Sequence, residues 1–176
     1  MRTPGDPRGR RAFTLVETIA VAVIVVLMAA VAVPRLSALG TARAGVAARI
    51  LARDLDFARE RAMLTGERCW AVFNLGAQQY SLLEENSASP GRSGASVITD
   101  LFTGKPLVRS LNTGDFAGVS LLTASFDGTV EVGFTWIGKP LAATEAALAS
   151  TGTVTVTGGG TVSVLAATGA VSWSMP

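Results

Sequence analysis

The chain has 176 residues, with 15 Lys and Arg against 13 Asp and Glu and a formal net charge of +2, and this length suits a single domain. It has no histidine, which excludes histidine-based triads and histidine-ligated metal sites. Its one cysteine, Cys69, excludes an intrachain disulfide and a thiolate zinc site. We therefore expect no enzyme activity, metal or cofactor. We interpret Cys69 as a buried strand thiol, with a reactive or intermolecular thiol as the alternative.

The positive charge is concentrated at the N-terminus. The first twelve residues contain one acid and four arginines, Arg2, Arg8, Arg10 and Arg11. Residues 13–176 hold eleven basic and twelve acidic side chains, a charge of −1. After residue 68, four basic residues face seven acidic ones, so we do not expect this region to bind the phosphate backbone of a nucleic acid.

An uncharged apolar run, TIAVAVIVVLMAAVAV, occupies residues 18–33. A bilayer core of ~30 Å needs about 20 helical residues, and the 21 residues from Phe13 to Val33 meet that length. We therefore predict a membrane-spanning helix, with a buried helix of a soluble protein as the alternative. An ordinary secretory signal, cleaved at the Ala-x-Ala of residues 30–32, is opposed by the length of the run and by the carboxylate of Glu17 near its start.

Glu17 is the informative residue of this segment. A carboxylate inside a spanning helix costs about 2–3 kcal/mol or more, so such residues are rarely accidental. No Lys or Arg stands at helical spacing from Glu17 within the run. Its partner must therefore come from the membrane interface, from another subunit or from protonation.

The sequence RRA–FTLVE, followed by TIAVAVIVVLMAAVAVP, resembles the class III signal of type IV prepilins and type II secretion pseudopilins. The resemblance implies that prepilin peptidase cuts between Ala12 and Phe13, on the cytoplasmic side, and methylates the new amine of Phe13. Glu17 is then the fifth residue, which in this family pairs with the N-terminal amine of a neighbouring subunit and sets the register of assembly. Pro34 matches a helix-kinking proline of the family.

One position departs from this pattern, because the family usually has glycine before the cut and this chain has Ala12. Alanine is the next smallest side chain, so the expected cut stays after Ala12. A cut after Gly9 would leave two arginines on the mature end, and we reject that register.

Residues 35–66 continue as an amphipathic helix with one apolar face, and Gly66 is the expected C-cap. The arginines on the other face suggest contact with nucleic acid or anionic lipid as one interpretation. The alternative, which we favour, is a solvated face with intrahelical pairs such as Asp56 with Arg53 or Arg59.

From residue 68 onward the hydrophobic period changes to two, which predicts strands separated by glycine-rich turns. Residues 85–105 are a polar stretch that we expect to be a long surface loop. The triple glycine at 158–160 lacks the Lys-Ser/Thr ending of a phosphate loop and predicts a hairpin turn. The expected strands are 69–75, 79–83, 107–111, 118–122, 130–136, 152–157, 161–165 and 170–174.

The globular half resembles the H-type minor pseudopilins and FimT-like minor pilins. The segment ARDLDFARERA before the strand CWAVF, the FDG and IGKP motifs and the C-terminal TVTVTGGGTVSVL carry this resemblance, although the ending TGAV lacks the arginine of the family's TGRV. The resemblance implies an α+β fold, with a long N-terminal helix packed on a C-terminal antiparallel β-sandwich-like domain. The expected division is a leader 1–12, a membrane or filament-core helix 13–34, an amphipathic helix 35–66 and a globular β domain 67–176.

The resemblance thus implies a minor pseudopilin of a type II protein secretion system, which assembles into a periplasmic pseudopilus that drives protein export. We expect a single-pass inner-membrane protein, with its N-terminus cytoplasmic before cleavage and its globular domain periplasmic. Its expected partners are prepilin peptidase/methyltransferase, the inner membrane and other pseudopilins or pilins bound through the N-terminal helix, and we expect no small-molecule substrate.

Two alternatives remain. The first is a FimT-like minor type IV pilin that serves pilus assembly or DNA uptake, which the acidic C-terminal region disfavours. The second is a plain signal-anchored exported protein, whose size would not depend on prepilin peptidase.

Overall fold

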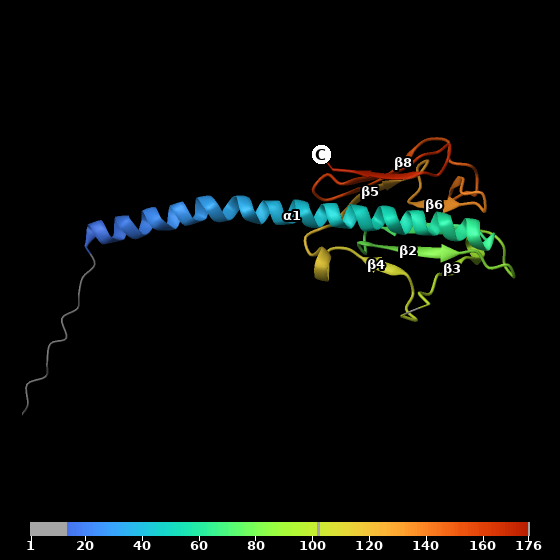
Figure 1. The fold of residues 1–176 in the computed structure, drawn as a ribbon, viewed down its shortest axis with the longest axis horizontal. Helices are drawn as coiled ribbons and strands as arrows, with labels where there is room; N and C mark the ends of the chain where they lie inside the picture. Colours follow the sequence, from blue (N-terminus) through green and yellow to red (C-terminus); the bar gives the residue numbers. More distant parts are fainter. Residues whose placement is uncertain (1–13, 102, 176) are drawn as a thin grey trace, which may run out of the picture. The chain divides into compact units, whose positions relative to one another are not determined.

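One long helix opens the fold. The computed structural model describes residues 14–101 and 103–175, and for residues 31–39 it describes the backbone alone. Helix α1 runs from Leu15 to Thr65 (Figure 1). It ends at Gly66, which adopts a φ of 78° and donates its N–H to the carbonyl of Ala62 at 3.1 Å. Glycine reaches this left-handed conformation without steric cost, so the expected C-cap is confirmed.

The chain divides into two compact units, one ending at Leu39 and the other beginning at Gly40. The first consists of the N-terminal part of α1. The second contains the rest of α1 and every strand of the described chain. The boundaries expected from the sequence, at residues 12, 34 and 66, stay predictions.

Two antiparallel sheets make up most of the second unit. The larger sheet has the order β3-β2-β1-β6-β7, with β4 also paired to β2. The smaller has the order β10-β9-β8-β5. The strands of the larger sheet are β1 (Cys69–Asn74), β2 (Gln79–Glu84), β3 (Ser96–Val97), β4 (Val108–Ser110), β6 (Glu131–Phe134) and β7 (Pro140–Ala142). The smaller sheet holds β5 (Leu121–Ser125), β8 (Gly152–Val156), β9 (Thr161–Val164) and β10 (Val171–Ser174). Two short 3-10 helices, η1 (Arg92–Gly94) and η2 (Gly114–Phe116), interrupt the connections.

The C-terminal part of α1 and both sheets bury one shared core. In Figure 1 this part of α1 lies beside β2 and β4 and also beside β5 and β8. The buried helix face is built mainly from alanines, which leave room for the sheets to approach closely. For example, a Cβ added at Gly158 would lie 2.9 Å from the Cβ of Ala44. The residues of this face are Ala44, Ala47, Ala48, Leu51, Ala52, Leu55, Ala58 and Ala62, all at most 5% exposed.

The larger sheet is buried on both faces around Trp70. Trp70 pairs across the sheet with Leu83 on one side and Gly133 on the other, and the side chains of Trp70 and Leu83 lie outside the shared core. Trp70 is nevertheless fully buried. Gly133 makes this possible, because an added Cβ would lie 2.5 Å from the indole Nε1 of Trp70. Loops outside the sheet must therefore cover this face.

The expected fold class, α+β with a long N-terminal helix packed on antiparallel sheets, is confirmed. Three local expectations need correction. Strand β5 begins at Leu121 rather than residue 118, because Gly118 lies in a turn with a φ of 85°. The short strands β3 and β7 were not predicted, since two or three residues are too few to show a period. β3 also lies in the expected 85–105 loop, which is partly a sheet edge with Ile98 buried.

Candidate assembly site

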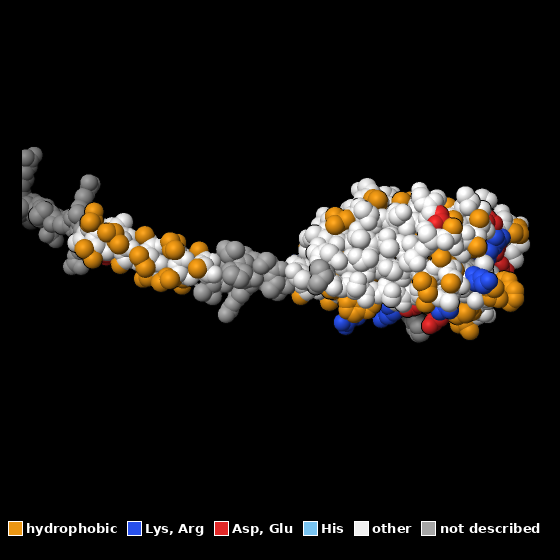
Figure 2. All heavy atoms as spheres, turned by 90° about the horizontal axis from the view of Figure 1, so that it is seen from above, with side chains coloured by type: hydrophobic (Ala, Val, Ile, Leu, Met, Phe, Trp, Pro, Cys, Tyr) orange, Lys and Arg blue, Asp and Glu red, His pale blue; other side chains and the backbone are white. Residues whose placement is uncertain are grey.

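The N-terminal part of α1 leaves large apolar side chains in solvent on every side. Residues 23–28 cover more than one helical turn, and each is at least 52% exposed. Figure 2 shows hydrophobic side chains over the visible face of this segment. A helix that is apolar all round normally lies in a large protein, an assembly or a membrane. The exposed residues are Leu15, Val16, Ile19, Val21, Val23, Ile24, Val25, Val26, Leu27 and Met28.

Glu17 is the one charged residue in this apolar segment between residues 14 and 30. It lies in the first turn of α1, and its backbone N–H donates to the hydroxyl of Thr14 at 3.2 Å. This bond satisfies one of the free N–H groups of the helix end, as an N-cap residue does. Within the described residues, the Glu17 carboxylate has neither a hydrogen bond nor an ion pair. It is an exposed charge set among apolar side chains.

The other predicted site residues are only partly covered by the structure. Ala12 and Phe13, the expected cleavage and methylation positions, lie outside the described residues. Pro34 lies within α1, whose helical backbone continues through it, and its side chain is not described. The expected kink therefore stays a prediction. In the part of the chain that the structure describes, no helix combines the length and hydropathy that a membrane span requires.

A buried polar cluster joins the second half of α1 to the larger sheet. The carboxylate of Asp54, on α1, accepts a hydrogen bond from the Tyr80 hydroxyl at 2.7 Å and from Nε of Arg109 at 2.7 Å. Burial, followed by the nearby Asp54 carboxylate, raises the pKa of Tyr80 well above its ordinary value, so Tyr80 stays a neutral donor. The cluster fixes the helix to β2 and β4 at one point.

A groove lies directly beside this cluster, between α1 and the edge of the larger sheet. It encloses about 460 Å³, a volume within the range of ~300–1,000 Å³ usual for ligand sites. One wall is α1, with Arg53, Phe57 and Arg61, and the other is β4 and the hairpin before it. Both walls carry charged and exposed apolar side chains. The groove is a feature that the sequence did not predict.

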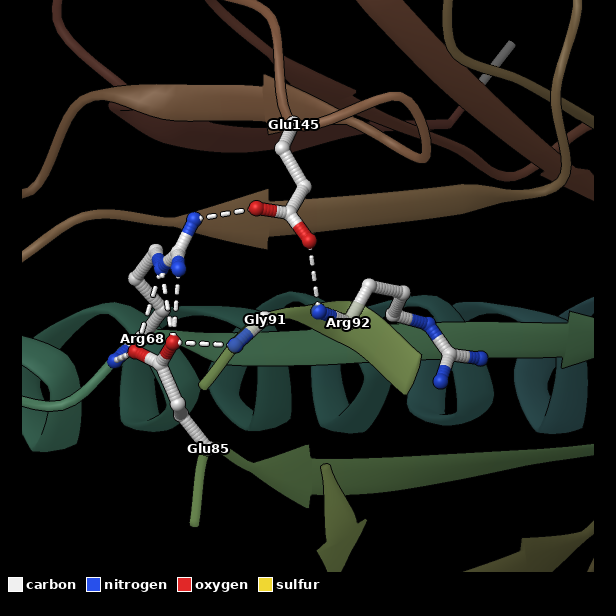
Figure 3. Close-up of polar contacts among 5 residues, drawn as sticks. All are labelled: Arg68, Glu85, Gly91, Arg92 and Glu145. Carbon is white, nitrogen blue, oxygen red and sulfur yellow. Dashed lines mark hydrogen bonds and ion pairs between the residues drawn. The ribbon is translucent and has the colours of Figure 1, made fainter. Parts of the chain in front are cut away.

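A second polar network holds the loop after β2 (Figure 3). The Glu85 carboxylate accepts bonds from the Arg68 guanidinium, at 2.6 Å from Nη2, and from the Gly91 N–H at 2.5 Å. Glu145 accepts from Arg68 Nη1 at 2.5 Å and from the Arg92 N–H at 2.6 Å. The guanidinium of Arg68 also lies 5.6 Å from the centre of the Trp70 ring. The network therefore lies against the outer face of the sheet and keeps water from Trp70.

The hydrogen bonds of this network lower the pKa values of its two carboxylates, Glu85 and Glu145. The hydrogen bond from Arg68 lowers the pKa of Glu85 to about 2, and the Gly91 N–H acts in the same direction, against a smaller opposing effect of burial. The hydrogen bond from the Arg92 N–H lowers the pKa of Glu145. Both carboxylates are therefore ionised at neutral pH. The network is a structural clamp, in which both carboxylates are held by hydrogen bonds from Arg68 and from backbone N–H groups.

Cys69 is confirmed as a buried strand thiol. It lies in β1 with none of its surface exposed. Burial raises the pKa of the thiol to about 12, and a protonated thiol without solvent access is inert. Among the described residues, no cluster of three or more His, Cys, Asp or Glu side chains could hold a metal ion.

Solved structures share this fold. A crystal structure of the minor pseudopilin EpsH from the type II secretion system of Vibrio cholerae matches with a TM-score of 0.57 and 11% sequence identity, over 77% of this chain and 98% of that chain. A second structure of the same EpsH protein matches with a TM-score of 0.56 and 11% identity, over 76% and 96%. The chain therefore has the fold of a minor pseudopilin. No model of a known protein family and no curated protein matches its sequence.

Sequence reasoning missed the Asp54–Tyr80–Arg109 cluster and the Arg68–Glu85–Glu145 network. Part of the second was open to prediction, because Arg68 and Glu85 flank the predicted strands 69–75 and 79–83 and pair across the hairpin that these strands form. The other contacts join residues 26 to 77 positions apart, and no local pattern indicates them. The ion pair of Arg61 likewise reaches Glu84 of β2 at 2.8 Å rather than a residue of the helix.

Proposed function

We propose that this chain is a minor pseudopilin of a type II protein secretion system, a subunit that joins a periplasmic filament and performs mechanical work. The observation that carries the proposal is the shared fold with the minor pseudopilin EpsH, which extends over 98% of the EpsH chain. The described residues add support, because a helix that packs on the sheets at one end is apolar on all sides at the other.

Assembly would proceed through this apolar segment. Residues 15–28 would exchange lipid for the equivalent helices of neighbouring subunits, a step that close packing and interhelical polar contacts stabilise. Glu17 would then be the one charge inside an apolar bundle. A carboxylate in such surroundings is stable only beside a cation, and a neighbour's N-terminal amine would supply one. The attraction is strong in a low dielectric, but it offsets the desolvation of both groups only when they are close together, so it would fix the register of the subunits.

Processing and placement follow from the same proposal. Prepilin peptidase would cut between Ala12 and Phe13 and methylate Phe13, creating the amine that the pair requires. Before assembly, residues 13–33 would hold the subunit in the inner membrane, with the arginine-rich leader in the cytoplasm, as the distribution of positive charge favours. The unit beginning at Gly40 would lie in the periplasm.

The charges of the globular domain favour secretion over DNA uptake. After residue 68 the acidic side chains outnumber the basic ones. Three of the five basic residues from Arg68 onward, namely Arg68, Arg92 and Arg109, are held by carboxylates of the same chain. A surface of this kind supplies few free cations for a phosphate backbone.

The proposal is tested by identifying the first residue of the mature chain and its methylation. The chain is expressed in a host that has prepilin peptidase and in the same host without it, and its N-terminal peptide is analysed by mass spectrometry. We expect N-methylated Phe13 as the first residue in the first host and an intact leader in the second. A mature chain that begins elsewhere, or one that loses its leader in both hosts, would contradict the proposal.

A further inference from the structure

The groove between α1 and β4 is lined by apolar side chains that remain in water. Phe57 on α1 is 40% exposed, Val108 on β4 is 41% exposed and Leu101 in the hairpin before β4 is 89% exposed. Beneath them, Leu82 and Ile98 form a buried apolar floor. Large apolar side chains gathered at one hollow, and backed by a buried floor, are typical of a protein interaction site.

The backbone of β4 is open on the side away from β2. In antiparallel pairing, successive residues direct their N–H and C=O groups to alternate sides. Leu107 accepts from the Leu82 N–H at 3.1 Å and Leu111 donates to the Gln78 carbonyl at 2.7 Å, so odd-numbered residues face β2. Val108 and Ser110 therefore face outward, and in the described chain no strand pairs with that edge. The Val108 N–H donates to the Pro106 carbonyl at 2.8 Å, which leaves the Val108 carbonyl and the backbone groups of Ser110 for an added strand. An unpaired edge is a template for an added strand.

The free charge at the groove is positive. Arg61 is held by Glu84 at 2.8 Å and Arg109 by Asp54 at 2.7 Å. Arg53, on the helix wall, is exposed and makes no ion pair with any described residue. Lys105, next to the lining residue Pro106, is also exposed and without an ion pair in the described chain. The lining also contains Asp100, which accepts from the Thr103 hydroxyl at 2.9 Å. The three lining arginines, Arg53, Arg61 and Arg109, outnumber the two lining acids, Asp54 and Asp100, so the groove is complementary to a carboxylate.

We propose that this groove binds an extended, apolar and acidic segment of a partner protein, which adds as a strand to the open edge of β4 while its carboxylate pairs with Arg53. Backbone bonds to the Val108 carbonyl and to the N–H and carbonyl of Ser110 supply affinity, and alternate apolar side chains of the segment enter the hollow beside Phe57. Arg53 selects acidic segments over basic ones. This site does not use the apolar segment of residues 15–28, so its test is independent of the proposed function.

The test uses two labelled peptides of about seven residues, a usual strand length. One alternates valine with glutamate and the other valine with lysine, and both have blocked ends. Fluorescence anisotropy measures their binding to the full chain in detergent micelles. We expect the acidic peptide to bind the tighter of the two. Equal binding of both peptides, or binding of neither, would overturn the proposal.

Two variants locate the binding. Arg53→Glu removes the free cation and is expected to weaken the acidic peptide about fivefold, as for an exposed ion pair. Ser110→Pro removes one outward N–H but no bond to β2, and is expected to weaken both peptides about fivefold. Arg49→Glu is the matched control, because Arg49 lies on the same helix over the Trp173 ring at 5.0 Å, outside the groove lining. Circular dichroism confirms that each variant is folded.

The variants also separate other occupants from the proposed one. Binding that Arg49→Glu weakens as much as Arg53→Glu would place the peptide elsewhere and overturn the proposal. Sedimentation of the detergent-solubilised chain tests for a second copy in the groove. If Arg53→Glu lowers the oligomeric state and leaves peptide binding unchanged, a second copy is the occupant and the proposal fails.

Discussion

The carboxylate of Asp54 lies 2.7 Å from the hydroxyl of Tyr80, although the two residues are 26 positions apart and belong to α1 and β2. Asp54 is 8% exposed and Tyr80 is 2% exposed, so this is a buried contact between the helix and the larger sheet. Arg109 of β4 also donates a hydrogen bond, from its Nε, to the Asp54 carboxylate. One helical carboxylate thus holds two strands in place.

Replacing this carboxylate should destabilise the globular domain. Asp54→Asn removes the charge that holds Arg109 and leaves both donors with a weaker partner. We expect the free energy of unfolding to fall by about 1–3 kcal/mol. Urea denaturation of the full chain in detergent, followed by circular dichroism, measures the loss. The matched control is Asp115→Asn at an exposed position in η2, with an expected change within about 0.5 kcal/mol.

Stability should fall in acid through Glu85. Its pKa is about 2 in the folded chain, below its ordinary value of 4.5, so the unfolded chain takes up the proton first as the pH falls. The contribution of Glu85 is complete above pH 4.5 and is lost as the pH falls toward 2. Urea unfolding across this window should show a weaker pH dependence in Glu85→Gln than in the wild type. Some dependence remains in that variant, because Glu145 and Asp127 also have lowered pKa values. A variant as pH-sensitive as the wild type would contradict the role of Glu85.

A methyl group at residue 133 should disturb the buried indole of Trp70. The added Cβ in Gly133→Ala would lie 2.5 Å from Nε1 and 2.7 Å from Cδ1 of Trp70, and the fully buried ring has little room to move. We expect a loss of about 1–3 kcal/mol in the free energy of unfolding, measured by urea denaturation. Gly45→Ala is the control on α1, where the nearest atoms lie at an ordinary 3.8 Å. For Gly45→Ala we expect no loss in the free energy of unfolding. An equal loss in both variants would show that contact with the Trp70 ring is not the cause.

Removing the charge of Glu17 should impair assembly without impairing membrane insertion. Under the proposed function, Glu17→Gln cannot pair with a neighbour's amine, and its incorporation with partner subunits should fall by at least about tenfold, as expected when a buried ion pair is broken. Cross-linking and co-purification from the producing host measure incorporation, and membrane fractionation measures insertion.

Two further variants separate this role from helix capping. Glu17→Asp keeps the charge and should retain part of the incorporation with partner subunits. Thr14→Val removes the hydroxyl that accepts the Glu17 N–H but leaves the carboxylate, so it should assemble normally. If Thr14→Val were as defective as Glu17→Gln, capping of the helix would explain the effect instead.

The sequence by itself determined the elements that follow a repeating local pattern. The end of α1 at Thr65, the strands β1 and β2 and the hairpin β8–β9 were predicted close to their bounds in the structure, because hydrophobic periods of 3.6 and two report which face of each element is buried. Glycine at residue 66 marked the end of the helix for a local reason too, since only glycine adopts that backbone without strain. The isolated carboxylate of Glu17 was likewise evident from the sequence.

Only the tertiary structure decided which distant residues meet. Asp54 and Arg109 are 55 positions apart, and Arg68 and Glu145 are 77 apart, and their partners depend on how the helix and sheets pack. The short edge strands β3 and β7, and the open edge of β4 beside Phe57, also arise only when the sheet is assembled. The physical reason is that local periodicity encodes burial, whereas contacts between elements depend on the packing of the whole domain.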